Sequence, residues 1–458
     1  MRRANGEAGI FLFRQPLVQL LVQKKYLRLH QQTLAIPTIV MTVFMSFYTM
    51  VDGLFVSNLI GTDALSAVNL TAPIISLVTA VSTMLATGGS AVIMKKTGER
   101  KTREANEDFT FLIIVNVIVG LIMSCLGYLV MDTVFESMAL SPKVFSYCQL
   151  YLSRYLIFTV PILLMNNFTL YMIAAGKSAL SMVCSIVGGI LNMALDYVFI
   201  AIRDMGIAGA AIATGLGYSV TAVAGVVMFS NKNRMLHFVK PVCRFKTLLH
   251  AATNGCSEMA TALVAGMVTM MFNWTMLKYV GENGAAAITI IMYVLMFATS
   301  LYTGYSYGVA PMASFYYGEQ NHEKLKKLVR MSLKVISVIA VAALVVSIVA
   351  TKPLVSIFAR PDNPVYGLAA AGNRICSFAL IFIGFNVFTS GMFTALSNGL
   401  ISAILAFSRS FVFMVIAMLI LPALLGVTGV WLATPAAELA AMALSLFMFI
   451  KHQKRYQY

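Results

Sequence analysis

Charged residues are scarce in this chain. Asp, Glu, Lys and Arg together make up 11% of its 458 residues, and 59% are hydrophobic, whereas about 25% are charged in an ordinary soluble domain. A water-soluble fold of this composition would lack a polar surface. The apolar residues come in blocks of about twenty, the length at which a helix crosses the roughly 30 Å hydrocarbon layer of a bilayer. The sequence therefore predicts an integral membrane protein that crosses the bilayer many times.

The sequence is also poor in residues that carry covalent chemistry. It has six cysteines without a CxxC pair and five histidines without a cluster, and it lacks a GxxxxGK[ST] loop. These absences exclude a disulfide framework, a zinc site and ATP hydrolysis within the chain. We expect no enzymatic activity and no cofactor. Transport is predicted instead, and a channel would differ from a transporter in showing conductance rather than gradient-driven substrate movement.

Acidic residues are fewer than basic ones, which gives a net charge of +16. The basic residues are spread over short loops rather than gathered on one soluble domain, so anionic lipid is expected as a partner and nucleic acid is not. With a cytoplasmic amino terminus, most of the basic loops fall on the inner side. The positive-inside rule then predicts that both termini are cytoplasmic, that the number of helices is even, and that the protein lies in the plasma or inner membrane.

The apolar blocks predict an all-α integral membrane protein with 12 transmembrane helices. The expected spans are residues 33–56, 67–94, 109–131, 150–173, 179–200, 207–230, 248–275, 285–314, 328–350, 371–395, 400–421 and 428–450. The corresponding segments are a basic amphipathic arm on the inner leaflet (1–32), an amino-terminal lobe (33–230), a cytoplasmic linker (231–247), a carboxy-terminal lobe (248–450) and a cytoplasmic tail (451–458).

The chain resembles itself at an offset of 220 residues. Gly88 and Gly98 fall on Gly308 and Gly318, and the segment Gly206 to Gly209 falls on Gly426 to Gly429. Separate stretches that agree on one offset predict duplication of a six-helix unit. Because six is even, both copies enter the membrane in the same orientation, and a pseudo-two-fold axis along the membrane normal relates the two six-helix lobes. A transporter of this type has its cavity between the lobes.

Several segments resemble the multidrug and toxic compound extrusion (MATE) family. They are MVDGLFVSNLIGTDALSAVNL from Met50, KKTGERKTREAN and its repeat YYGEQNHEKLKK, GGILNMALDYVFI before MGIAGAAIATGLG, and GVTGVWLATPAAE. The resemblance covers nearly the whole chain from about residue 33. It implies a secondary antiporter that exchanges protons or sodium ions for bulky organic cations and drugs. It also implies two six-helix lobes around a cavity that opens alternately to each side.

Two aspartates lie inside the predicted helices, where an ionisable side chain costs several kcal/mol and is a functional candidate. Asp52 and Asp196 each lie about one turn from the outer end of their helix, so they reach a similar depth. Asn192 lies four residues before Asp196 on the same helix face, and Thr214 lies at a comparable depth in the next helix. The resembled family, in one branch, uses an aspartate on helix 1, an Asn-x-x-x-Asp pair on helix 5 and a threonine on helix 6. Asp52, Asn192, Asp196 and Thr214 match that pattern.

Two carboxylates in one poorly hydrated pocket repel each other, so we expect this pair to bind protons reversibly as a unit. Alternatively, the four oxygen-bearing side chains suit sodium, so H⁺ and Na⁺ both remain candidates for the coupling ion. A third interpretation is a polar network that only holds helices 1, 5 and 6 together. The 220-residue offset places Phe272 against Asp52 and Ile416 against Asp196, so the cluster is expected in one lobe alone.

Other polar residues in the spans are weaker candidates. Some members of the resembled family rely on acidic residues in helices 7 and 10; Glu258 matches the former, and helix 10 offers only Asn386. Glu258 and Glu438 are therefore candidates for a second coupling or substrate site, with a buried polar contact as the alternative. Arg409 resembles an arginine common in helix 11 of the family, and we expect it to be structural or to snorkel.

The cargo is expected to be a cationic, amphiphilic small molecule, because the intramembrane acids favour positive charge. A flippase for lipid-linked or oligosaccharide cargo, with a more cationic cavity, is the alternative.

Pro37 is a predicted hinge in the first helix. With both lobes in one chain, a monomer suffices. The residues expected to line the substrate cavity are Met45, Tyr48, Asn166, Asn167, Tyr293 and Asn386.

Overall fold

The computed structural model describes all residues except 1–30, 53–54, 56–58, 61 and 139. The amphipathic arm predicted at 1–32 therefore lies almost entirely outside the described residues. Within the described part of the chain, every regular element is a helix. Eleven helices are long and apolar enough to cross a membrane, and the number rises to 12 if one bent pair counts as a single span. The predicted order of spans is thus reproduced.

The amino-terminal half begins with a helix over Gln31–Asp52 that continues through Pro37. Its other helices are α2 (Thr62–Gly98), α3 (Thr102–Ser137), α4 (Pro142–Ile157), α5 (Thr159–Ala174), α6 (Ser178–Asp196), the π-helix η1 (Tyr197–Ile202) and α7 (Gly206–Phe229).

The carboxy-terminal half has the same succession of long helices. Its elements are α8 (Phe245–Val280), α9 (Glu282–Gly318), α10 (His322–Val349), α11 (Thr351–Ser356), α12 (Pro364–Cys376), η2 (Ser377–Ala379), α13 (Leu380–Ala395), α14 (Gly399–Phe407), the π-helix η3 (Ser408–Val412), α15 (Phe413–Leu425) and α16 (Val427–Tyr456).

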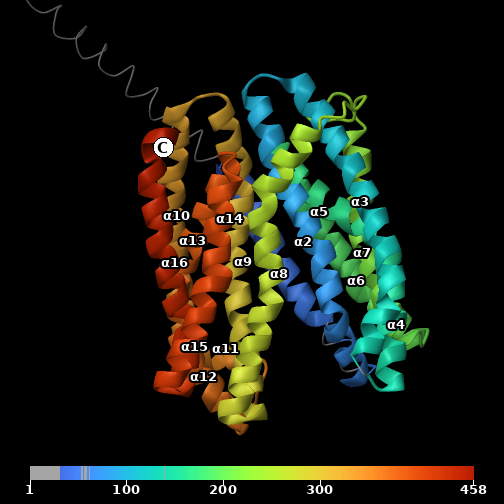
Figure 1. The fold of residues 1–458 in the computed structure, drawn as a ribbon, viewed down its shortest axis with the longest axis vertical. Coiled ribbons are helices and arrows are strands. Elements are labelled where there is room, and N and C mark those ends of the chain that lie inside the picture. The colour runs from blue at the N-terminus through green and yellow to red at the C-terminus, as the bar shows by residue number, and fades with distance from the viewer. Residues whose placement is uncertain (1–30, 53–54, 56–58, 61, 139) are drawn as a thin grey trace, which may run out of the picture.

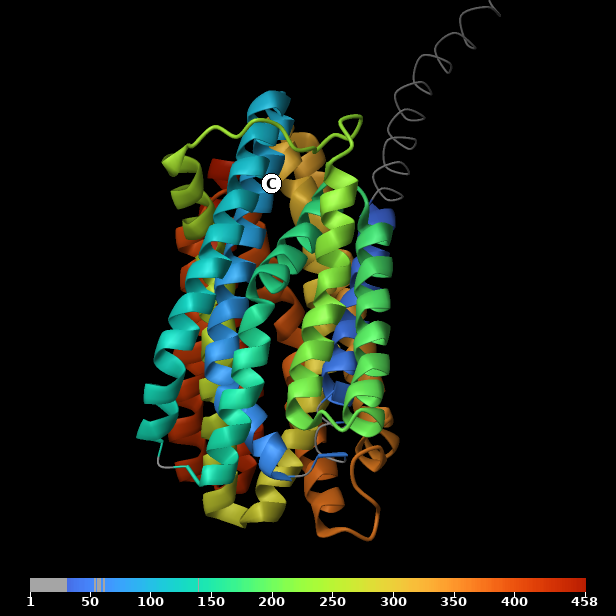
Figure 2. The same cartoon turned by 90° about the vertical axis from the view of Figure 1, so that its right-hand side faces the viewer.

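Several helices are longer than the apolar blocks predicted. The block at 67–94 lies within α2, which has 37 residues and is therefore about 55 Å long. The extra turns carry polar residues such as Lys95 and Lys96, which hydropathy alone does not assign to a span. Helices α4 and α5 form the bent pair, with an angle of 55° between them, visible in Figure 2. Pro161 lies in the first turn of α5 and cannot donate a backbone hydrogen bond, which explains the bend.

The two halves meet where α2 crosses α8. A Cβ atom added at Gly88 would lie 1.8 Å from the carbonyl oxygen of Ala251, and one at Gly255 would lie 1.8 Å from that of Met84. The two backbones are therefore in direct contact, as small residues allow between membrane helices. The crossing lies toward the end of the molecule that holds the carboxy terminus, and the halves diverge toward the opposite end (Figure 1).

The first helix crosses α9 in a related way. Gly304 lies against Thr42 and Ile39 of the first helix, and Gly308 lies against Thr38. The hydroxyl of Thr42 also donates to the carbonyl of Ser300 at 2.8 Å. Each half thus contributes one long helix to the other, and this arrangement agrees with the duplication that the 220-residue offset predicted.

Candidate functional site

The carboxylates of Asp52 and Asp196 lie close enough to interact directly. Asp196 is the last residue of α6 before η1 and is fully buried, while Asp52 lies on the first helix and is half-buried. Among the described residues, no donor reaches Asp52 Oδ1 or either carboxylate oxygen of Asp196. Two neighbouring carboxylates without a donor are costly in a membrane interior. A proton or cation between them would remove that cost.

Asn192 and Thr214 extend this pair into a group of four. The Asn192 side-chain amide donates to the Thr214 hydroxyl at 3.3 Å, and that hydroxyl donates to the Ala210 carbonyl at 3.0 Å. Asn192 Oδ1 is buried and has no donor among the described residues. Because Asn192 precedes Asp196 by one helical turn, its free oxygen and the carboxylates face the same region. The structure therefore brings the four predicted residues together from three helices.

The sequence did not predict two features of this site. The π-helix η1 begins directly after Asp196, and π-turns are frequent at functional sites. Phenol groups also surround the pair: Tyr48 and Tyr218 lie with hydroxyl oxygens 3.2 Å apart, and Tyr151 interacts electrostatically with both aspartates. Tyr218 follows Thr214 by one turn, so helical spacing could have identified it. No comparable signal pointed to Tyr151.

A cavity of about 10 Å³ lies beside the four residues, and Met45, Tyr48, Asn192 and Tyr218 line part of it. Met45 and Tyr48, which were predicted to line the substrate cavity, line this small cavity. This volume holds about one water molecule, so an organic cargo does not fit here without movement of the helices.

A second cavity, of about 40 Å³, lies between the halves and contains Glu258. Its wall also includes Thr87 and Ser90 of α2, and Ser306 and Tyr307 of α9. Within the described part of the chain, Glu258 has no hydrogen bond or salt bridge to another side chain. An acidic group without a fixed partner therefore faces the space between the two halves.

Glu438, the other candidate for a second site, is already paired. Arg409 Nε lies 2.8 Å from Glu438 Oε1 and 3.0 Å from Oε2. The Asn386 side-chain amide donates to Glu438 Oε2 at 2.7 Å and to the Glu438 carbonyl at 2.9 Å. Asn386, expected to line the substrate cavity, is instead 2% exposed and holds this carboxylate.

The remaining candidates do not come together. Asn167 is buried between α5 and α3, where its side chain exchanges hydrogen bonds with Asn116, so it does not line the substrate cavity as expected. Asn166 is half-buried on α5. Tyr293 stacks on Phe358 with ring centroids 5.6 Å apart and lines a separate cavity within the carboxy-terminal half.

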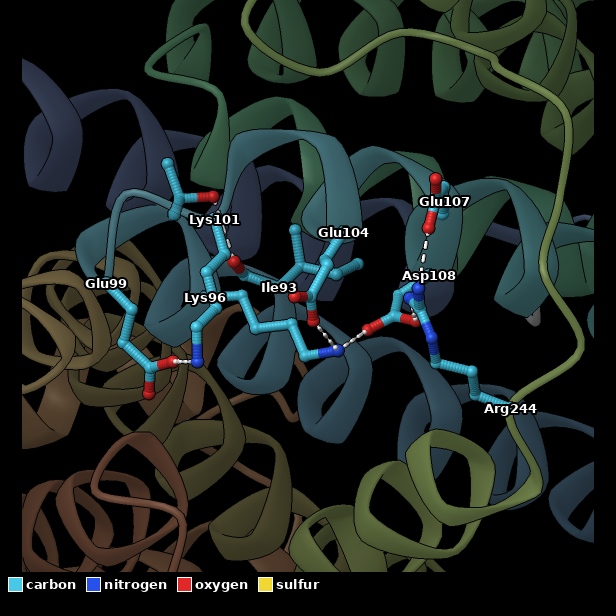
Figure 3. Close-up of polar contacts among 9 residues, drawn as sticks. Ile93, Lys96, Glu99, Lys101, Glu104, Glu107, Asp108 and Arg244 are labelled. Carbon is cyan, nitrogen blue, oxygen red and sulfur yellow. Dashed lines mark hydrogen bonds and ion pairs between the residues drawn. The ribbon is translucent and has the colours of Figure 1, made fainter.

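A charge cluster around Asp108, which the sequence did not single out, joins α2, α3 and the linker (Figure 3). Asp108 accepts from Lys96 Nζ at 2.5 Å and from Arg244 at 3.0 Å, and its side chain is fully buried. Arg244 also pairs with Glu107 at 2.6 Å. Burial lowers the pKa of Arg244, but the hydrogen bonds to Asp108 and Glu107 outweigh it and raise the pKa overall. This cluster fixes Arg244 directly before the first residue of α8.

The linker before Arg244 is docked on the amino-terminal half. Asn106 donates to the Met235 carbonyl at 3.2 Å and accepts from the His237 backbone at 2.9 Å. Phe238 stacks on Phe109 with ring centroids 5.4 Å apart. The linker therefore belongs to the packing of the amino-terminal half up to the start of α8 (Figure 2).

Comparison with known proteins places this arrangement in a family. The family model MatE matches two segments of the chain, residues 37–198 and 258–420. The chain belongs to the MatE family. The two matches begin 221 residues apart (258 − 37), in agreement with the internal offset of 220. The MATE resemblance and the duplicated fold are thus confirmed, and membership of a transporter family agrees with the prediction that the chain is not an enzyme.

Relatives and solved structures of MatE proteins match over nearly the full chain. The multidrug export protein MepA of Staphylococcus haemolyticus is 22% identical over 423 residues, covering 92% of this chain and 93% of the relative. MepA of Staphylococcus saprophyticus is 20% identical, covering 91% and 92%. The crystal structure of MATE in complex with MaL6 superposes with a TM-score of 0.89 at 22% identity, covering 93% and 96%. An outward-facing multidrug resistance MATE transporter gives 0.88 at 22%, with the same coverage.

The MatE fold comprises 12 membrane spans in two lobes. The first helix to α7 form the N-lobe, and α8 to α16 form the C-lobe.

Proposed function

We propose that this chain exports cationic, amphiphilic small molecules across the cell membrane in exchange for protons or sodium ions. The observation that carries the proposal is the pair of Asp52 and Asp196, of which Asp52 Oδ1 and both carboxylate oxygens of Asp196 are buried without a donor among the described residues. Coupling of ion movement to cargo movement requires a group that an exchangeable ion neutralises. The relatives named multidrug export proteins support the choice of cargo class.

The site suits either ion. A proton shared between Asp52 and Asp196 would leave one negative charge on the pair. A sodium ion would find hard oxygen ligands in the two carboxylates, Asn192 Oδ1 and the Thr214 hydroxyl. In both cases the ion neutralises groups on the first helix, α6 and α7, and these helices pack closer when repulsion is removed. The small cavity beside Tyr48 would change in volume as they move.

Transport then follows from alternating access of the two lobes. In the conformation described, α2 and α8 are in backbone contact at one end and the lobes diverge at the other. Ion binding from the open side would favour release of cargo, because ion and cargo compete for the same moving helices. Opening the seam at Gly88 and Gly255 would expose the cavity to the opposite side.

The orientation and setting of the chain are part of this proposal. Both termini lie in the cytoplasm, so that the closed end carries the basic loops and contacts anionic lipid. The chain acts as a monomer in the plasma or inner membrane, with lobes at 33–230 and 248–450 joined by the linker 231–247. The acids beside the two cavities, including Glu258, favour cationic cargo over an anionic lipid-linked one.

Efflux of the cationic dye ethidium from proteoliposomes tests the proposal. A pH gradient and a sodium gradient are imposed separately, with the membrane voltage clamped. We expect one of the two gradients to drive dye movement, and Asp52→Asn and Asp196→Asn to abolish it. Dye movement that ignores both gradients, or that persists in both variants, would contradict the proposal.

A further inference from the structure

The C-lobe has no counterpart of the aspartate pair. At the positions that the 220-residue offset relates to Asp52 and Asp196, Phe272 is buried in an apolar core and Ile416 is 49% exposed. The C-lobe does contain intramembrane acids, Glu258 and Glu438, but at other positions. Their surroundings decide whether they take part in ion exchange.

The surroundings of Glu438 resemble an ion site in which the cation is already present. It lies on α16, its side chain is 7% exposed, and the Asn386 amide fixes one carboxylate oxygen. Asn386 Oδ1 is buried without a donor among the described residues, as Asn192 Oδ1 is in the N-lobe. The difference is the cation. Arg409, on the π-helix η3, contacts both carboxylate oxygens through Nε.

We propose that Arg409 is a built-in counter-ion that replaces a transported coupling ion in the C-lobe, so that the protein couples through the N-lobe alone. The inference rests on the proposed antiport function and adds its stoichiometry. A guanidinium stays charged throughout the cycle and cannot dissociate from the chain. As long as this contact holds, Glu438 needs no other cation and exchanges no ion.

The same pairing defines the charge available to cargo. Arg409 also interacts electrostatically with Glu258, but its hydrogen bonds are with Glu438. With both glutamates ionised, Glu258, Glu438 and Arg409 together carry one net negative charge, and the unpaired Glu258 lines the cavity between the lobes. One positive charge on the cargo balances it, so the site is suited to monovalent organic cations.

The test measures coupling ions per cargo molecule. In voltage-clamped proteoliposomes with a fixed ethidium gradient, the ion gradient that nulls dye flux gives this ratio for the wild type and three variants. Arg409→Gln frees Glu438, so the ratio is expected to rise by about one ion. Arg409→Lys retains a fixed cation, and Arg409→Gln combined with Glu438→Gln removes both charges, so these two are expected to keep the wild-type ratio.

A measurement without turnover covers the case in which Arg409→Gln folds but does not transport. Equilibrium binding of ²²Na⁺ and proton uptake on titration are counted on purified protein. Arg409→Gln should bind one more cation than the wild type, and the double variant should not. An unchanged count and ratio in Arg409→Gln would overturn the inference.

If Arg409→Gln does not fold, Glu438→Gln decides the question. Its freed guanidinium would pair with Glu258, so ethidium binding should weaken by tenfold or more while the ion ratio stays unchanged. A changed ion ratio would overturn the inference, and so would unchanged dye binding. A wild type with no ion-driven flux would instead refute the proposed antiport function, so the two failures are distinguishable.

Discussion

Asp52 and Asp196 are 144 positions apart in the chain (196 − 52), yet their carboxylates interact directly. Neither has a basic partner among the salt bridges of the described residues. Acids elsewhere in the chain, such as Asp108 and Glu438, are neutralised by lysine or arginine. The N-lobe pair therefore lacks the fixed counter-ion that these acids have.

Replacing Asp196 by Asn should reduce gradient-driven ethidium efflux at least tenfold. The amide keeps the shape of the side chain but cannot carry the charge that binds the ion. Initial rates in proteoliposomes measure the effect. Asp204→Asn is the matched control, because Asp204 is exposed in the loop after η1, and it should leave the rate within twofold. Equal rates in both variants would remove the ion-binding role of Asp196.

Cargo binding should weaken as the coupling ion is added. Protonation or sodium binding neutralises Asp52 and Asp196, so the attraction of the N-lobe for a cation falls as pH falls or as sodium rises. Fluorescence titration of ethidium on purified protein, at several pH values and sodium concentrations, shows which ion competes. The double variant Asp52→Asn and Asp196→Asn should lose this dependence; if it keeps the full dependence, competition occurs elsewhere.

Adding a side chain at the seam between the lobes should disrupt the closed end. A valine at Gly88 would place its Cβ 1.8 Å from a backbone carbonyl, where no side chain can give way. Overpacking of this kind costs roughly 1–3 kcal/mol or more, so Gly88→Val should lower the melting temperature and reduce efflux. Gly266 lies in α8 with nothing within 4 Å, and Gly266→Val is the control. A Gly88→Val protein as stable as the control would show that the seam tolerates separation.

Removing the charge of Asp108 should weaken the start of α8. Asp108→Asn leaves Lys96 and Arg244 without their shared buried carboxylate, and we expect a loss of roughly 1–3 kcal/mol in stability, since both cations are partly exposed. Thermal melting of the purified protein measures it. Glu104→Gln removes only an outer contact of Lys96 at 3.3 Å, with 44% of the Glu104 side chain exposed, and should change little. Equal melting temperatures would indicate that the cluster is dispensable.

Sequence periodicity was sufficient for the order of the helices, and together with the family resemblance it named the four N-lobe residues that the structure brings together. Hydropathy locates the apolar blocks, and Asn192 lies one helical turn before Asp196. The depth of these side chains in the membrane and the helix face that they share could therefore be predicted from residue spacing. The partner of Glu438 could not be predicted from residue spacing. Arg409 lies on η3 and Glu438 on α16, so helical spacing along the chain does not relate them. Helix ends were also underestimated, because polar turns such as those at Lys95 continue α2 beyond the apolar block.

The docked linker has a mechanical consequence. Because the linker is held on the N-lobe up to Arg244, a bend in the covalent connection to the C-lobe would fall in α8 rather than in the linker, and that point would act as a fulcrum. Helix α8 has 36 residues and is a lever arm about 54 Å long. A tilt of about 10° at the fulcrum would carry its far tip through roughly 9 Å. Small displacements at Arg244 are thus converted into wide excursions at the opposite membrane surface.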